Sequence, residues 1–354
     1  MSINFTSRDR RIAGNITSAL MSLAIIILFI SHKFSQLSHS LTTPVNKVLT
    51  PLAQDILSFE RSHQSLSIYI LGATIFCLMF YLFIFTTRRT LYPQGIYLQP
   101  IIYSALAVAI SSMAASPLIA AATMLLSIMI TTEICSVNHT SYAASIYSDT
   151  PISFKSPTSR LLAGALYMGL LSLIQPSALI LVMTIPIIIF CFDRYIYELF
   201  IPMIAFFAPM GIELYIRWWL YDANVDLLID RYWAMFSVDG SIFTSWSSYT
   251  TLLQSSYATT FLVIFSLILS GLGLARILNY SITARAHQRF VYCVVLFIVG
   301  IFMTMLSSFA IDVLLIIAAP VAILITAALI NLRVWVSVAI FLLYLLLTLV
   351  AIFN

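Results

Sequence analysis

The feature that most constrains this chain is an uncharged stretch from Leu161 to Phe192, interrupted near its middle by Gln175, Pro176 and Ser177. A single membrane-spanning helix needs about 20 apolar residues, so this stretch is too long for one span and short for two. We therefore expect two helices, over 161–174 and 176–192, that meet at a proline hinge. The first would be about 21 Å long, which is less than the roughly 30 Å of a hydrocarbon core. Because backbone can stop inside a membrane only where protein or a water-filled cavity covers it, the hinge predicts a cavity.

The composition indicates that the whole chain is embedded in a membrane. Hydrophobic residues make up 61% of its 354 residues and charged residues 8%, whereas soluble domains carry about 25% charged residues. Apolar windows recur from end to end, and they predict an all-α, polytopic integral membrane protein with about eleven transmembrane helices, within a range of about ten to twelve. We expect the spans near 12–31, 67–86, 97–115, 117–135, 161–174, 176–192, 199–215, 256–275, 290–307, 311–330 and 334–353. Residues 1–354 then form a single transmembrane domain with long outer loops near 32–66 and 216–255, and no nucleic-acid partner is expected.

The basic residues predict the orientation of these spans. With the N-terminus in the cytoplasm, twelve of the 17 Lys and Arg fall on the inner side and five on the outer side. The inner ones are Arg8, Arg10, Arg11, Arg88, Arg89, Lys155, Arg160, Arg194, Arg276, Arg285, Arg289 and Arg333, and the outer ones are Lys33, Lys47, Arg61, Arg217 and Arg231. Cytoplasmic loops carry an excess of Lys and Arg, so this distribution predicts a cytoplasmic N-terminus and, with an odd number of spans, an outer C-terminus.

The first outer loop contains two acids that are candidates for chemistry. Asp55 and Glu60 would lie about 140° apart on a helix, so they do not form a carboxylate pair on one face. Either could act as a general base, with Arg61 holding a phosphate. The alternative is an amphipathic helix lying on the membrane, with Leu52, Ile56 and Phe59 facing the lipid. No metal site is predicted, because the histidines of this loop lack a recognisable ligand spacing.

The second outer loop combines aromatic residues with acids. Trp218 and Trp219 are followed by Asp222, and aromatic residues of this kind collect at membrane–water interfaces. An aromatic surface beside carboxylates would also suit a sugar. Arg217 and Arg231 are the cations that could hold a phosphate there, and Glu213 is spaced for an i,i+4 pair with Arg217.

The hinge region resembles a known superfamily. Ala163-Gly164, Gly169-Leu170, Gln175-Pro176-Ser177-Ala178-Leu179 and Ile185-Pro186 are similar to a recurring stretch of the C-type glycosyltransferases, which use polyprenyl-phosphate sugars. The resemblance covers about 32 of the 354 residues, and Gln175 stands where many of those enzymes have lysine. It implies that an acid of the first outer loop deprotonates the acceptor, a place that Asp55 and less closely Glu60 occupy. The pair of adjacent acids expected after the first span is absent, since His32-Lys33 stands there.

A wider resemblance runs from about Arg88 to Trp219. Arg88-Arg89-Thr90-Leu91, the stretch from Phe154 to Pro176, and Arg194, Glu198, Ile201-Pro202 and Pro209 are similar to an uncharacterised Bacteroidota family of multi-pass membrane proteins. This resemblance implies a fold and an inner-membrane location but no chemistry.

Three functions remain open at this point. The first is a membrane enzyme that moves a sugar from a polyprenyl phosphate to an acceptor at the outer face, with Asp55 as base and Arg61, Arg217 or Arg231 holding the phosphate. The second is a transporter or lipid flippase, which the broken helix at Gln175 favours because transporters place substrates at such breaks. The third is a non-catalytic membrane subunit of an envelope assembly. Membrane lipid is the expected partner, and neither a cofactor nor a protein partner can be specified.

Overall fold

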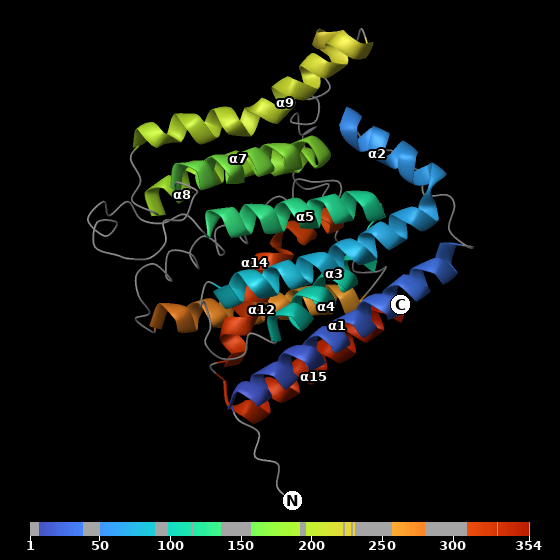
Figure 1. The fold of residues 1–354 in the computed structure, drawn as a ribbon, viewed down its shortest axis with the longest axis vertical. Coiled ribbons are helices and arrows are strands. Elements are labelled where there is room, and N and C mark those ends of the chain that lie inside the picture. The colour runs from blue at the N-terminus through green and yellow to red at the C-terminus, as the bar shows by residue number, and fades with distance from the viewer. Residues whose placement is uncertain are drawn as a thin grey trace, which may run out of the picture.

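The protein is represented by a computed structural model that describes residues 7–37, 50–88, 98–112, 114, 116–135, 157–191, 196–221, 224–227, 229–230, 257–279, 310–330 and 332–353. Every regular element within these ranges is a helix (Figure 1). The helices are α1 (Ser7–Leu37), α2 (Pro51–Ser62), α3 (Gln64–Arg88), α4 (Leu98–Ser112), α5 (Pro117–Ile134), α7 (Pro157–Ile174), the 3-10 helix η1 (Pro176–Met183), α8 (Thr184–Cys191), the 3-10 helix η2 (Ile196–Leu199), α9 (Phe200–Tyr221), α12 (Tyr257–Asn279), α14 (Ala310–Ile330) and α15 (Val334–Phe353).

Five of the described helical segments are long and apolar enough to cross a membrane. They are Ile16–Ser35, Gln64–Phe85, Pro117–Ile134, Ile196–Leu220 and Trp335–Phe353. Shorter apolar helices cover Leu98–Ser112, Ser159–Ile174, Leu181–Phe190, Tyr257–Gly273 and Leu314–Thr326. These ten segments overlap ten of the predicted spans, five of them at spanning length, and the remaining predicted span, 290–307, lies outside the described residues. The helical class and the membrane character that the sequence predicts are therefore confirmed.

Polar contacts identify which helix ends lie on the same side of the bundle. Lys33 near the end of α1 donates its Nζ to the carbonyl oxygen of Ser112, the last residue of α4. The hydroxyl of Ser112 in turn donates to the carbonyl oxygen of Ala351 near the end of α15. Glu60 of α2 binds Ser116, immediately before α5. The ends of α1, α4 and α15 and the start of α5 therefore lie on one side of the bundle, which we call the α2 end.

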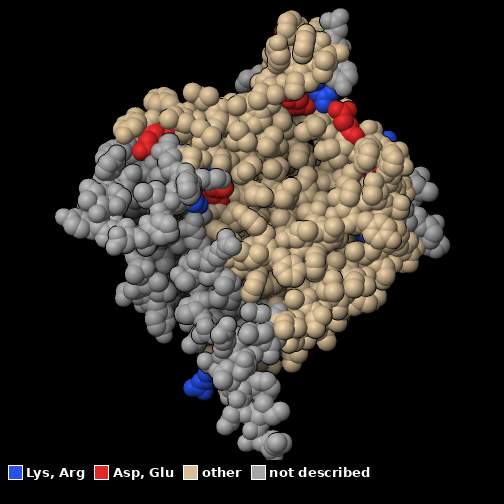
Figure 2. Space-filling model, viewed as in Figure 1, with Lys and Arg blue, Asp and Glu red and all other residues tan. Residues whose placement is uncertain are grey.

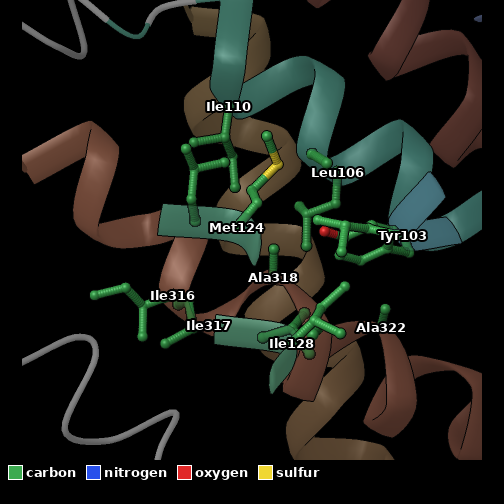
Figure 3. Close-up of a cluster of buried hydrophobic side chains, with 14 of the residues drawn as sticks. Tyr103, Leu106, Ile110, Met124, Ile128, Ile316, Ile317, Ala318 and Ala322 are labelled. Atoms are coloured by element: carbon green, nitrogen blue, oxygen red, sulfur yellow. The ribbon is translucent and has the colours of Figure 1, made fainter. Parts of the chain in front are cut away.

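The helices form layers between two edges of the bundle. Figure 1 shows α9 along one edge, followed by α7 and α8 and then by α5, while α1 and α15 lie side by side at the opposite edge. Helix α4 lies inside, in contact with α1, α3, α14 and α15. Every residue of α4 from Gln99 to Ser111 is buried, which explains why this helix is apolar on all sides. Its side chains interdigitate with those of α5 and α14 around Leu106, Met124 and Ala318 (Figure 3).

The proline hinge differs from the prediction in two respects. Helix α7 begins at Pro157 and has 18 residues, so it is about 27 Å long and not the short, 21 Å helix expected. After extended backbone at Gln175, the chain continues as the 3-10 helix η1 before α8 begins at Thr184. The hydroxyl of Thr184 lies 3.7 Å from the sulfur of Met168, so η1 folds back along α7. Ile174, the last residue of α7, packs on Ala53 of α2, so the break lies at the α2 end of the bundle and not partway along it.

Candidate functional site

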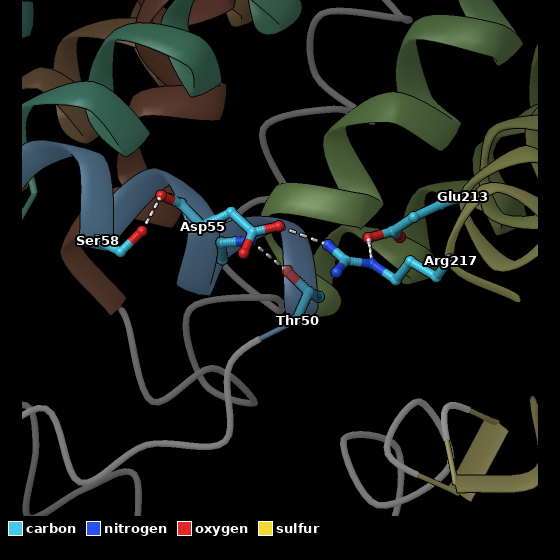
Figure 4. Close-up of polar contacts among 6 residues, drawn as sticks. Thr50, Asp55, Ser58, Glu213 and Arg217 are labelled. Atoms are coloured by element: carbon cyan, nitrogen blue, oxygen red, sulfur yellow. Dashed lines mark hydrogen bonds and ion pairs between the residues drawn. The ribbon is translucent and has the colours of Figure 1, made fainter. Parts of the chain in front are cut away.

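The candidate site lies at the α2 end, where Arg217 joins two acids from different helices. The Arg217 Nη2 atom is 2.7 Å from Oδ2 of Asp55 in α2, and its Nε atom is 3.0 Å from Oε1 of Glu213 in α9. Figure 4 shows the guanidinium lying between the two carboxylates. The i,i+4 pair of Glu213 and Arg217 predicted from the sequence is thus confirmed. The structure also brings together Asp55 and Arg217, two of the predicted site residues, which are 162 positions apart.

The two acids differ in their exposure to solvent. The side chain of Asp55 is 66% exposed, whereas those of Arg217 and Glu213 are 18% and 11% exposed. Two carboxylates share one guanidinium, so the group carries a net negative charge when all three are ionised. A phosphate bound at Arg217 would therefore compete with Asp55, the more exposed and less enclosed of the two acids.

Exposed aromatic side chains flank Arg217 in the sequence of α9. Tyr215 lies 6.0 Å from Trp218 and 6.3 Å from Trp219 between ring centroids, and all three rings are exposed. Figure 2 shows acidic and basic side chains gathered beneath a projection at the upper edge of the molecule, while much of the described surface below them is tan. This placement fits both interpretations of the aromatic residues, an interfacial belt and a surface for a sugar ring.

Glu60 occupies a different position and serves the start of α5. Its Oε2 atom accepts hydrogen bonds from the Ser116 hydroxyl at 2.5 Å and from the backbone N–H of Leu118 at 3.3 Å. Burial raises the pKa of the Glu60 carboxyl above its ordinary value of 4.5, and these two hydrogen bonds oppose the rise. Asp55 and Glu60 therefore face different helices, as their angular separation predicted, and Glu60 helps to attach α2 to α5.

The apolar face of α2 packs on protein. Ala53 is fully buried and forms a cluster with Ile119 and Ile174, against which Leu52 and Ile56 pack. The expectation that Leu52 and Ile56 face lipid is therefore wrong, because the ends of α5 and α7 cover that side of the helix. Phe59 does stay 46% exposed and stacks on His63 with ring centroids 4.7 Å apart.

Gln175 lies at the break between α7 and η1. Its side chain is buried, and its Nε2 atom has no hydrogen-bond partner among the described residues. The preceding residue, Ile174, packs with Ala53 of α2 and Ile119 of α5. Helix α2 therefore packs against the residue beside the hinge, and the hinge holds a buried amide donor without a partner among the described residues.

The remaining predicted site residues are dispersed or lie outside the description. Arg61 is exposed at the end of α2. Asp222 and Arg231 lie outside the residues whose side chains are described. Within the described ranges, no three His, Cys, Asp or Glu side chains come together as metal ligands.

Two residues of this end were missed in the sequence analysis. Ser116 caps α5 by accepting a hydrogen bond from the N–H of Ile119, and Pro117 occupies the first helical position. The Ser-Pro pair is a recognisable signal for a helix start. Lys33, at 2.5 Å from the Ser112 carbonyl oxygen, holds the end of α4, for which the sequence offers no local signal.

A comparison of the chain with known protein families, with curated proteins and with solved structures finds no match. The two family resemblances drawn from the sequence therefore stay predictions.

Proposed function

We propose that the chain is a multi-pass protein of an inner membrane, with about eleven transmembrane helices, a cytoplasmic N-terminus and the α2 end on the outer side. The distribution of described basic residues supports this orientation. Three of them, Lys33, Arg61 and Arg217, lie at the α2 end. Seven lie at the opposite ends of their helices, namely Arg8, Arg10, Arg11, Arg88, Arg160, Arg276 and Arg333. An excess of basic residues marks the cytoplasmic side.

We further propose that the α2 end transfers a sugar from a polyprenyl phosphate to an acceptor hydroxyl. The observation that carries this proposal is the position of Arg217, a partly buried cation beside an exposed carboxylate at the end of an apolar bundle. The lipid tail would remain in the membrane along the apolar helices, and the phosphate would meet Arg217. Guanidinium groups suit phosphate because their donors match its oxygens.

Asp55 and Arg217 can be assigned separate roles in this reaction, one for the proton and one for the leaving phosphate. Asp55 would accept the proton of the acceptor hydroxyl while the acceptor oxygen forms a bond to the anomeric carbon of the sugar. The bond from that carbon to the phosphate oxygen breaks, and the polyprenyl phosphate leaves with the electron pair and the negative charge. Arg217 would stabilise that charge. Binding of the donor phosphate to Arg217 also frees Asp55 from its ion pair, so the base becomes available when the donor is present.

The test is transfer of a radiolabelled sugar from a polyprenyl phosphate by the purified protein in lipid vesicles. Asp55→Asn and Arg217→Gln should each reduce transfer at least about 100-fold, the scale of a lost general base or charge stabiliser. The matched control is Asp226→Asn, which changes an exposed acid beyond the end of α9 and should leave transfer unchanged. Full activity of Asp55→Asn would overturn the assignment of the base.

A second candidate function is a non-catalytic membrane subunit of an envelope assembly. The observation that favours it is that Asp55 is already bound by Arg217, while Gln175 is buried beside Ile174, which packs on Ala53 of α2. In this case the protein isolated from native membranes would be part of a stable stoichiometric complex. Asp55→Asn would then leave both the complex and the phenotype of the cell intact.

A further inference from the structure

Glu213 and Asp55 hold Arg217 in different ways. Glu213 lies one turn before Arg217 on the same helix, so the two side chains stay together as long as α9 is helical. It also lies two turns after Phe206, whose carbonyl oxygen lies against Gly169 of α7, and this position explains why its side chain is only 11% exposed. Asp55 comes from another helix and is 66% exposed. Glu213 is therefore the fixed partner of Arg217, and Asp55 is the one that a ligand can replace.

The guanidinium keeps hydrogen-bond donors for such a ligand. Glu213 accepts from Nε of Arg217, and Asp55 accepts from Nη2 (Figure 4). The described residues leave both donors on Nη1 and the second donor on Nη2 unused. A phosphate that replaces Asp55 would therefore meet donors on both terminal nitrogens while Glu213 holds Nε in place.

The charges of this group determine which phosphate it fits. Glu213 offsets the charge of Arg217, and Asp55 adds one negative charge. A phosphate group with one negative charge that replaces Asp55 leaves the total charge beside the guanidinium unchanged. A phosphate group with two negative charges adds a further charge in partly buried surroundings, where charges repel more strongly than they do in water.

The other described cations of the α2 end are placed elsewhere. Arg61 lies six residues after Asp55 on α2, which is about 120° around the helix. Lys33 belongs to α1 and bonds to the end of α4, and α1 lies at the edge of the bundle opposite α9 (Figure 1). Within the described part of the chain, neither cation is therefore positioned to offset a second negative charge at Arg217.

We propose that Glu213 determines the charge of the ligand at Arg217. The site takes a phosphodiester, which carries one negative charge, and discriminates against a diphosphate diester, which carries two. This inference rests on the phosphate site of the proposed function. Both a lipid-linked sugar and the headgroup of an ordinary phospholipid supply a singly charged phosphodiester. Glu213 acts through Arg217, so it is a positioning residue that sets specificity and not a catalytic one.

Binding of two ligands that differ by one phosphate tests this inference. The probes are radiolabelled farnesyl phosphoglucose and farnesyl diphosphoglucose, and their Kd values are measured on the purified full-length protein in detergent at constant salt. The wild type should bind the monophosphate at least about tenfold more tightly, the scale of one additional charge in partly exposed surroundings. Glu213→Gln keeps an acceptor for the Arg217 Nε–H but removes the charge, so this preference should fall at least about fivefold. Glu213→Asp keeps the charge and should keep the preference.

The controls separate this inference from the proposed function. Asp226→Asn removes an exposed acid beyond the end of α9 and should leave the preference unchanged. An unchanged preference in Glu213→Gln, together with loss of binding in Arg217→Gln, would overturn the role of Glu213 and leave the phosphate site standing. If the wild type binds neither probe, or if Arg217→Gln binds both as the wild type does, the phosphate site itself is overturned, and this inference with it.

Phosphatidylglycerol distinguishes the two sources of the phosphodiester, because its headgroup phosphate also carries one charge. If it displaces farnesyl phosphoglucose at similar concentrations, the role of Glu213 is supported and the natural ligand is a phospholipid, which contradicts sugar transfer. If it does not compete, the role of Glu213 is supported for a lipid-linked sugar.

Discussion

The interior of the bundle and its α2 end are held together by different interactions. In the interior, backbones approach one another closely. A Cβ atom added to Gly169 of α7 would collide with the carbonyl oxygen of Phe206 in α9, and one added to Gly273 of α12 would collide with that of Leu324 in α14. At the α2 end, side chains make the connections: Asp55 to Arg217, Glu60 to Ser116, and Lys33 to the carbonyl oxygen of Ser112.

The difference follows from the surroundings of the two regions, which are apolar in the interior and partly aqueous at the α2 end. In an apolar environment no hydrophobic driving force brings helices together, so close packing at small residues is the main source of association. At the end of the bundle, solvent reaches part of the polar groups, so charges can pair at a lower desolvation cost than in the apolar interior. We therefore expect the interior to respond to changes in side-chain volume and the α2 end to changes in charge, pH and salt.

The largest expected effect is that of Gly169→Ala. The new methyl group meets backbone atoms of Phe206, which cannot move aside as a flexible side chain could. We expect a loss of about 2 kcal/mol or more in the free energy of unfolding, measured as a lower Tm in detergent. Gly211→Ala in α9 is the control, because nothing lies within 4 Å of its added Cβ. That variant should be unchanged or up to about 1 kcal/mol more stable, since alanine favours helix over glycine. Equal responses of the two variants would contradict close packing of α7 on α9.

A smaller effect is expected for Ser116→Ala at the α2 end. This change removes the cap of α5, the acceptor for Ile119 N–H, and the hydroxyl donor to Glu60. Loss of such a cap costs about 1–2 kcal/mol in the free energy of unfolding. Ser58→Ala is the control, because the Ser58 hydroxyl is exposed and donates only to the Asp55 carbonyl oxygen of its own helix. Thermal unfolding of both variants checks the difference, and an equal loss for Ser58→Ala would argue against the cap.

Glu60 should give the α2 end a characteristic pH dependence. Because burial raises the pKa of its carboxyl in the folded protein above 4.5, the folded state holds this proton more tightly than the unfolded state. This contribution to stability is complete below the unfolded pKa and is lost as the pH rises through the folded value. Glu60→Gln removes it while keeping an acceptor for Ser116 and Leu118. We therefore expect the Tm difference between the wild type and Glu60→Gln to decrease as the pH is raised from about 4 to about 7. This interval begins near the ordinary carboxyl pKa. A rise over this interval would show that the pKa is lowered.

The smallest effect is expected for the ion pair of Asp55. Its carboxylate is largely exposed, and exposed ion pairs contribute about 0–1 kcal/mol. Asp55→Asn should therefore lower the Tm only slightly at low salt, and the difference should vanish near 1 M salt, where charges are screened within about 3 Å. Asp226→Asn controls for the loss of an exposed acid. A large loss of stability that persists at high salt would show that Asp55 has a structural role beyond the ion pair.

Much of the fold could be predicted from local sequence. Ten predicted spans coincide with apolar helices, since the length of an apolar run directly determines what can lie in a membrane. The start of α7 was misplaced because the segment from Pro157 to Arg160, a proline followed by two hydroxyl residues and an arginine, is not apolar and yet is helical. The apolar face of α2 was assigned to lipid because a hydrophobic stripe does not reveal whether lipid or Ile119 and Ile174 covers it.

The candidate site was predictable in part. Glu213 and Arg217 are one turn apart on a single helix, so their pairing follows from spacing alone. The role of Glu60 was not predictable, because its partner Ser116 lies 56 positions away on another helix.

The sequence by itself determined that this protein is a bundle of apolar helices in a membrane, because burial in lipid depends on runs of neighbouring residues. Only the tertiary structure decided which polar groups are paired. It brought Asp55 to Arg217 across 162 positions, attached Glu60 to α5, and buried Gln99 and Tyr103 among the apolar side chains of the interior. The physical reason is that helix formation is local, whereas the register and crossing of packed helices depend on side-chain volumes contributed from distant parts of the chain.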